Sequence, residues 1–131
     1  MATINIKTFT ETARKRAKAQ SIGYCARHIR MALEAAGGVV NPRPVSAKDY
    51  GRVMTDNDFN LVCEVINDGY KAKNGDVIVW GANSSTIHGH IQVYVQGFGW
   101  VSDFKQATIF PNSRKQELWL NGGYTIYRYN E

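Results

Sequence analysis

Cys25 and three histidines are the residues of this chain whose types could perform nucleophilic chemistry together. Cys25 stands at the predicted start of a helix, in the stretch GYCARHIRMALEAAG. The free N–H groups and the positive end of a helix N-terminus stabilise a thiolate, which is the reactive form of cysteine. Free cysteine is also among the most buried residue types, so core packing is the alternative interpretation of the same position.

A thiol nucleophile needs a base, and the candidates are His28, His88 and His90. His28 follows Cys25 by one turn of the same predicted helix, where a surface or packing role is expected. His88 falls in the loop GANSSTIHG, where it is expected to be a polar loop residue. His90 opens the run HIQVYVQ, and a strand would fix the orientation of its side chain. His90 is therefore the candidate base.

The residues after His90 read as a hairpin, and this hairpin offers a third member of the site. A tight turn at Gly97-Phe98 would pair Gln96 with Gly99 and bring Asp103 to the same face as His90, diagonally across the ladder. In that register Asp103 can orient the imidazole. A slip by one residue would move it to the other face, and a solvated carboxylate at a strand end is the alternative.

Two helices are predicted in the first third of the chain. The first runs from about Phe9 to Ala19, because Thr8 and Glu11 have capping-box spacing and good helix formers follow. The second runs from about Gly23 to Ala36, because apolar residues recur there at a spacing of 3.6. Gly37-Gly38 ends it.

After these two helices, the sequence predicts a loop with one short helix and then a series of strands. VVNPRPVSAKDYGRVMTDND reads as a loop with one short helix near Ala47 to Met54. Five runs of β-branched and aromatic residues follow, separated by Gly, Asn and Asp: FNLVCEVI, GDVIVW, HIQVYVQ, GWVSDF and YTIYRY. Helices first and strands afterwards predict an α+β fold, with N-terminal helices packed on a small antiparallel sheet or half-open barrel.

The composition fits a single domain over residues 1–131, with 44% hydrophobic and 21% charged residues. Cys25 and Cys63 are expected to be free thiols. The ordinary composition predicts a protein without membrane insertion, and a monomer is expected. No apolar run approaches the about 18 residues of a membrane span. The first residues lack the basic-then-apolar order of a secretory signal, so synthesis in the cytoplasm without a signal peptide is expected.

A formal net charge of +5 favours an anionic partner, either nucleic acid, an anionic membrane surface or an acidic cell-wall polymer. Much of the excess lies between Arg14 and Lys18. A solvated helix face is one interpretation of that cluster, and a patch that contacts an anionic substrate is the other.

The order GYCARHIRMALEAAG, GDVIVW and HGHIQVYVQGFGWVSDF resembles the papain-like peptidoglycan amidases and peptidases of the CHAP type and the related NlpC superfamily. Those enzymes carry Gly-x-Cys at a helix start, GD opening a strand, GH before alternating apolar residues, and an acidic or amide residue on the next strand. The resemblance spans about Ser21 to Phe104. It implies a papain-like fold, with Cys25 as nucleophile, His90 as general base and acid, and Asp103 as the group that orients His90.

The same resemblance implies hydrolysis of an amide bond in peptidoglycan peptide, with no cofactor and no metal. The Cys25 backbone N–H and the Gln20 side chain would stabilise the oxyanion. Tyr24, Trp80 and Trp100 flank the site in sequence and are candidates to line the cleft, although buried packing is the alternative for the tryptophans.

The small size and the lack of a cell-wall anchoring module resemble amidase effectors of the type VI secretion system, with a phage-type lysin as the alternative. Such an effector would act in the periplasm of a target cell or on the cell wall, and a cognate immunity protein would inhibit it. The region from Val39 to Asn74 matches no motif of these enzymes.

Two other functions are compatible with parts of the sequence. A basic nucleic-acid-binding module would use Arg14 to Lys18 and Lys105 on phosphates and stack aromatic residues on bases, without any need for Cys25. A metal site from Cys25 and the three histidines is disfavoured, because the paired spacings of structural zinc sites are missing.

Overall fold

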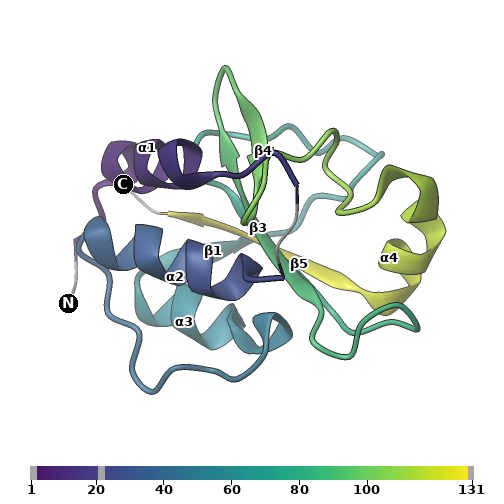
Figure 1. The fold of residues 1–131 in the computed structure, drawn as a ribbon, viewed down its shortest axis with the longest axis horizontal. Coiled ribbons are helices and arrows are strands. Elements are labelled where there is room, and N and C mark those ends of the chain that lie inside the picture. Colours follow the sequence, from purple (N-terminus) through teal and green to yellow (C-terminus); the bar gives the residue numbers. More distant parts are fainter. Residues whose placement is uncertain (1–2, 21–22, 130–131) are drawn as a thin grey trace.

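The computed structural model describes residues 3–20 and 23–129 (Figure 1). The helices are α1 (Ile6–Arg16), α2 (Cys25–Ala35), α3 (Gly51–Asp56) and α4 (Gln116–Gly122), with 3-10 turns η1 (Ala47–Asp49) and η2 (Ser113–Lys115). The strands are β1 (Phe59–Val62), β2 (Val77–Trp80), β3 (His90–Val95), β4 (Gly99–Val101) and β5 (Tyr124–Tyr129). The predicted α+β class is confirmed, and each of the predicted strands is present. None of the helices in these ranges is long and apolar enough to cross a membrane.

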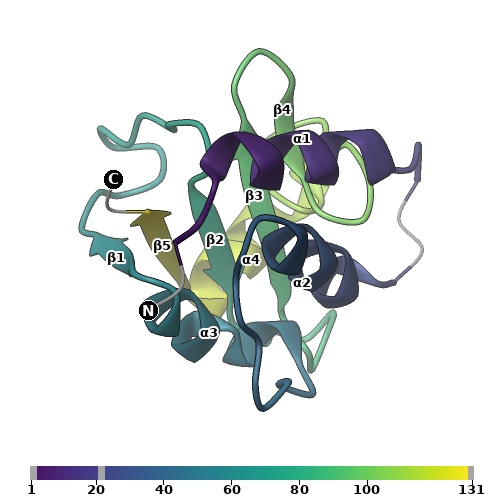
Figure 2. The same cartoon turned by 90° about the vertical axis from the view of Figure 1, so that its left-hand side faces the viewer.

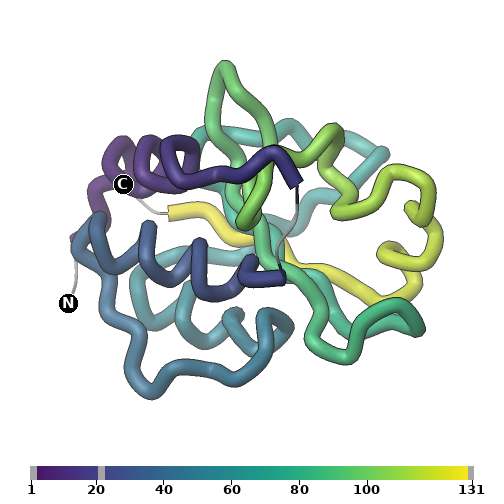
Figure 3. The backbone as a smooth tube through the Cα atoms, in the orientation of Figure 1, coloured from purple at the N-terminus to yellow at the C-terminus, as the bar shows by residue number. Residues whose placement is uncertain are grey.

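The strands form one antiparallel sheet in the order β1-β5-β2-β3-β4. The last strand, β5, lies between β1 and β2, so the chain returns from α4 to the middle of the sheet (Figure 3). Strand β3 is flanked on both sides, by β2 and β4. The residue at its start, His90, pairs with Trp80 of β2, whereas β4 pairs only with the second half of the strand, from Val93 to Val95.

The sheet separates two apolar clusters. Figure 2 shows α1 and α2 on one face of β2 and β3, and α4 on the other. Side chains alternate between the faces along each strand: Val79 joins the cluster that contains Leu33 of α2, whereas its neighbour Trp80 joins the cluster that contains Trp119 of α4. The rings of Trp80 and Trp119 meet edge to face, with centroids 5.9 Å apart.

The helices differ from their predicted bounds for local reasons. Helix α1 begins earlier than predicted, because Asn5 rather than Thr8 is its N-cap and accepts the Thr8 N–H at 2.9 Å. Helix α2 begins at Cys25 and ends at Ala35, close to the prediction, and Gly37 follows with φ 101°. Helix α4 was not predicted.

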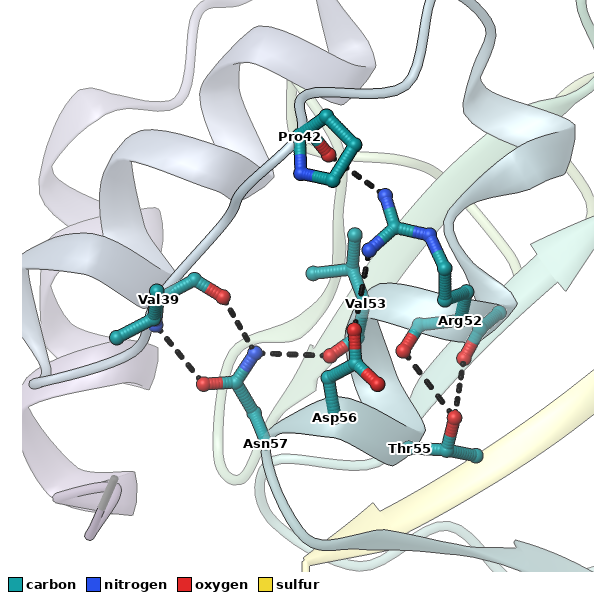
Figure 4. Close-up of polar contacts among 8 residues, drawn as sticks. Val39, Pro42, Arg52, Val53, Thr55, Asp56 and Asn57 are labelled. Atoms are coloured by element: carbon teal, nitrogen blue, oxygen red, sulfur yellow. Dashed lines mark hydrogen bonds and ion pairs between the residues drawn. The ribbon is translucent and has the colours of Figure 1, made fainter. Parts of the chain in front are cut away.

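The segment between α2 and β1 is tied down by hydrogen bonds (Figure 4). The buried amide of Asn57 accepts the Val39 N–H at 2.9 Å and donates to the carbonyls of Val39 and Val53, each at 2.8 Å. Arg52 of α3 donates to the Pro42 carbonyl at 2.6 Å. These bonds attach the loop that precedes η1 to α3. The loop therefore has a defined path although its sequence matched no motif.

Candidate active site

A cleft of about 500 Å³ brings Cys25 and His90 together. Cys25 comes from the first turn of α2 and His90 from the first position of β3. The walls of the cleft come from the loop before η1, the loop before β3, and α4; the lining residues from these three segments are Val45, Ser46, Ala47, Ser85, Thr86, His88, Gly89 and Trp119. The nucleophile and base predicted from separate motifs thus share one cavity.

The sulfur of Cys25 lies beside β3. Burial raises the pKa of the thiol above its ordinary 9.0, and the negative charge of Asp103 raises it further. The backbone N–H groups of Ile91, Ala26 and Cys25 itself act in the opposite direction. The contact with Ile91, the residue after His90, places the sulfur at the backbone of the first residues of β3. The thiol is protonated at neutral pH despite its place at a helix start.

His90 is neutral at pH 7 as well. Its ring is only 8% exposed, packs edge to face on Trp119 at 5.9 Å between centroids, and has its Nε2 2.8 Å from Oε1 of Gln106. Burial lowers the pKa of His90 to about 4, although the Gln106 bond and the charge of Asp103 oppose this effect. The cleft therefore contains a protonated thiol and an unprotonated imidazole.

A chain of buried amides determines which imidazole nitrogen carries the proton. The Trp80 indole nitrogen can only donate, and it lies 2.9 Å from Oε1 of Gln92, so that oxygen accepts. Gln106 donates to the same oxygen from Nε2 at 3.1 Å and therefore turns its own Oε1 toward His90. Since an amide oxygen only accepts, Nε2 of His90 holds the proton and Nδ1 keeps its lone pair.

The predicted register of the β3–β4 hairpin is wrong by one residue. Val95 pairs with Gly99, whereas the two-residue turn required Gln96 to do so. The Gln96 N–H instead donates to the Asn74 side chain at 3.0 Å, which removes it from the ladder. Strand β4 then ends at Val101, before Asp103. Asp103 consequently does not stand diagonally across a ladder from His90.

Asp103 lies instead against the start of α2. Its carboxylate is 2% exposed and accepts the N–H of Tyr24, the residue before Cys25, at 2.9 Å. A negative charge is favourable at this end of a helix. The hydrogen-bonded side chain beside His90 is that of Gln106, while Asp103 acts on the His90 and Cys25 pKa values through its charge.

The other predicted lining residues are distributed unevenly. Tyr24 lines the cleft and is 55% exposed. Trp80 and Trp100 are buried in the cluster on the far face of the sheet, where Trp100 packs on Tyr94 with centroids 5.2 Å apart. For both tryptophans, buried packing is therefore the correct interpretation, and lining of the cleft is not. Gln20 is exposed and does not line the cleft as formed by the described residues, so its placement there is not supported.

A scan against protein-family models finds no match, and neither does a search of curated proteins. Solved structures do match. A chain of the native type VI effector–immunity complex Tae3–Tai3 from Ralstonia pickettii is 31% identical, with a TM-score of 0.78 over 96% of this chain and 99% of that chain. The selenomethionine form of the complex matches at 30% identity and a TM-score of 0.77, over 94% and 100% of the two chains.

This chain belongs to the Tae3 family. The papain-like α+β fold expected from the sequence is confirmed by the Tae3 match. Because the match covers nearly the full length of both chains, the Tae3 fold also accounts for the region from Val39 to Asn74, which no sequence motif explained.

Sequence reasoning missed several residues that line this Tae3-family cleft, and it missed Gln106, which contacts His90 from outside the lining. Ser46 lies in the region without a motif, and its Oγ is 2.7 Å from Nδ1 of His88. His88, predicted to be a polar loop residue, thereby forms part of the cleft wall. Trp119 comes from the unpredicted α4, and Gln106 lies beyond the hairpin whose register was misjudged. Of these residues, only His88 has a sequence feature that indicates a role in the site, since it is a histidine two residues before His90.

The sequence predicts either a surface role or a packing role for His28, and the structure shows the packing role. Its Nε2 lies 3.0 Å from the Ala13 carbonyl, and burial lowers its pKa. Within residues 3–20 and 23–129, this Tae3-family chain has no group of three or more His, Cys, Asp or Glu side chains that could hold a metal ion.

Proposed function

We propose that this chain hydrolyses an amide bond in the peptide of bacterial peptidoglycan, with Cys25 as the nucleophile and His90 as the general base and acid. The observation that carries the proposal is the shared cleft of a thiol and a neutral histidine whose Nδ1 keeps its lone pair. The membership of the Tae3 family supports it, because the similar solved chains come from type VI effector–immunity complexes. These similarities do not favour a nucleic-acid-binding module.

The reaction begins with both groups uncharged. Nδ1 of His90 accepts the thiol proton while the sulfur of Cys25 attacks the amide carbonyl and forms a C–S bond. The Cys25 backbone N–H, at the start of α2, donates to the oxyanion that develops. The imidazolium then gives its proton to the leaving amine as the C–N bond breaks. Water deprotonated by the same nitrogen hydrolyses the thioester and restores the thiol.

Gln106 and Asp103 help His90 both to accept the thiol proton and to donate a proton to the leaving amine. Gln106 keeps the proton on Nε2, so that Nδ1 is the nitrogen presented to the thiol. The Gln106 bond and the negative charge of Asp103 both favour the protonated ring, which exists only between attack and departure of the amine. In this proposal Gln106 takes the orienting role predicted for Asp103, and Asp103 supplies charge and holds the residue before Cys25.

The biological setting follows from the same family. We expect a cognate immunity protein that inhibits the chain, since the similar structures are effector–immunity complexes. Action in the periplasm of a target cell or on the cell wall belongs to this proposal. The narrower assignment to the CHAP or NlpC groups is supported by the sequence motifs alone.

Digestion of purified sacculi tests the proposal. The wild type should release peptide fragments that mass spectrometry identifies, and Cys25→Ala should lower the rate by at least about 10³-fold, because the covalent route is lost. Cys63→Ala is the matched control, since Cys63 is an exposed free thiol outside the cleft. A folded Cys25→Ala protein that releases the same fragments at the wild-type rate would exclude the mechanism, and a wild type that releases none would exclude the function.

A further inference from the structure

A second cavity, of about 340 Å³, adjoins the start of α2. Tyr24 and Arg27 line both this cavity and the cleft that contains Cys25. The two cavities are therefore neighbours, with these two side chains at their common border. The remaining walls come from the C-terminal end of α1, from Lys18 after it, from His28 and Met31 of α2, and from Asp103.

The cavity is strongly cationic. Lys15, Arg16, Lys18 and Arg27 line it against a single carboxylate, Asp103, which already accepts the N–H of Tyr24. These four cations are exposed. The ion pairs found within residues 3–20 and 23–129 are formed by other cations: Arg30, Arg43, Arg52 and Arg128. The charge of the cavity thus faces solvent or a ligand.

Favourable interactions with helix dipoles do not explain all four cations that line the cavity. Lys15 and Arg16 lie in the last turn of α1, where a cation is favourable. Arg27, in contrast, is the third residue of α2, where the helix dipole makes a cation unfavourable. Lys18 lies beyond α1, and its backbone is fixed by bonds to Asp103 and Lys105 at 2.9 and 3.1 Å. Lys18 and Arg27 are therefore cations placed at this cavity without benefit to a helix.

We propose that this cavity is the subsite that binds carboxylate groups of the substrate peptide on one side of the bond cut at Cys25. The inference rests on the proposed function, because a peptide must cross the cleft to reach the cavity. Lysine and arginine bind carboxylates through charge-assisted hydrogen bonds. The subsite sets the direction of the substrate: its anionic segment points toward α1, and the opposite segment lies against Ser46 and His88.

Alkylation of Cys25 measures the cationic field without any peptide. Iodoacetate and iodoacetamide attack the same thiolate, each forming a C–S bond and releasing iodide, so the ratio of their rates cancels any change in the Cys25 pKa. In a Cys63→Ser background, Lys18→Glu with Arg27→Glu should lower the iodoacetate to iodoacetamide ratio by about 10-fold. Added salt should lower the wild-type ratio in the same direction.

Matched variants control for the net charge. Lys7→Glu with Lys115→Glu makes the same change of charge at two exposed lysines that do not line the cavity, and this variant should keep the wild-type ratio. An equal ratio in the wild type and the Lys18→Glu, Arg27→Glu variant would overturn the subsite. An equal fall in the control variant would overturn it too, because the field would then come from the whole molecule.

Hydrolysis of paired peptides identifies the occupant. The Lys18→Glu, Arg27→Glu variant should raise KM by about 10-fold for a stem peptide with free carboxylates, with kcat unchanged, because the charge contacts bind ground state and transition state alike. The KM for the same peptide with its carboxylates amidated should not change. If the wild type cleaves sacculi but the variant keeps the wild-type alkylation ratio, the subsite is refuted and the proposed function stands. An altered ratio in a protein that cleaves no peptide would refute the proposed function and exclude a peptide as the occupant.

Discussion

The two faces of the sheet hold the reactive pair by different means. On the face covered by α1 and α2 the contacts are apolar, and Cys25 is positioned by a helix that packs through residues such as Leu33, which is 0% exposed. On the opposite face, buried polar groups form a chain from Trp80 through Gln106 to His90. Packing therefore sets the position of the sulfur, whereas hydrogen-bond polarity sets the proton of the imidazole.

This difference predicts that the two faces respond differently to mutation. A truncation on the helical face should lower the free energy of unfolding and leave the activity of each folded molecule intact. A change in the polar chain should lower activity more than stability. Each prediction below tests one side of that contrast.

Gln106→Leu should have the largest effect on activity. Without the amide oxygen, nothing keeps the proton of His90 on Nε2, and kcat should fall by about 10²-fold or more. Gln106→Glu, which still accepts from Nε2, should keep more activity and move the acid limb of the pH profile upward, because a carboxylate stabilises the imidazolium. Gln96→Leu, at an exposed glutamine, is the control. If Gln106→Leu only lowered Tm, the orienting role would be contradicted.

Leu33→Ala should produce the largest loss of stability on the helical face. Removing this fully buried side chain leaves a cavity, which should lower the free energy of unfolding by about 3 kcal/mol in urea titrations. The kcat of the folded fraction should stay within about twofold, since the polar chain is untouched. Leu61→Ala, at a position that is 60% exposed, should cost less than about 0.5 kcal/mol. If Leu33→Ala lowered kcat as much as Gln106→Leu does, the two faces of the sheet would not differ in their effect on activity.

The pH profile should report the buried histidine. His90 accepts the thiol proton only when neutral, and its lowered pKa of about 4 keeps it neutral above that pH. The activity should therefore persist below pH 6.5 and be lost as the pH falls through about 4. Steady-state kcat/KM from pH 3.5 to 9, with circular dichroism to follow folding, checks this. An acid limb near 6.5 in the folded protein would show that His90 is solvated.

Trp80→Phe should have the smallest effect. The substitution removes the indole N–H that donates to Oε1 of Gln92. The carbonyls of Ile109 and Thr108 still accept from the two amides, so their orientation is weakened and not lost, and kcat should fall by only about threefold. Trp100→Phe is the matched control, because Trp100 belongs to the same buried cluster and is outside the polar chain. Equal kcat values for the two variants, compared at equal stability, would show that Trp80 acts by packing alone.

Short-range patterns predicted the elements that carry Cys25 and His90. An apolar stripe located α2, and alternation located β3, because both signals arise within a single element. The signals for α4 are also local: Asn112 caps η2, which leads directly into α4, by accepting the Arg114 N–H at 3.0 Å, and Gly123 ends the helix. They were overlooked among the strand signals of the second half.

Gln106 could not have been predicted in this way. It reaches His90 because the chain bends after Val101 and the Gln106 N–H donates to the Trp100 carbonyl at 2.9 Å. That path depends on the hairpin register, which in turn depends on the capture of the Gln96 N–H by Asn74. A contact that requires three distant segments has no signature in sequence spacing, so the assumed hairpin register and the resemblance pointed to Asp103 as the orienting group.

The anchored loop before η1 has a consequence for engineering. Its first part is fastened by Asn57 and Arg52, while Val45, at the edge of the cleft, is 93% exposed. Residues 43–45 can therefore be randomised, or lengthened by an insertion, with little penalty to folding. A library confined to these positions would redesign one wall of the cleft for new peptides while the scaffold beneath it stays constant.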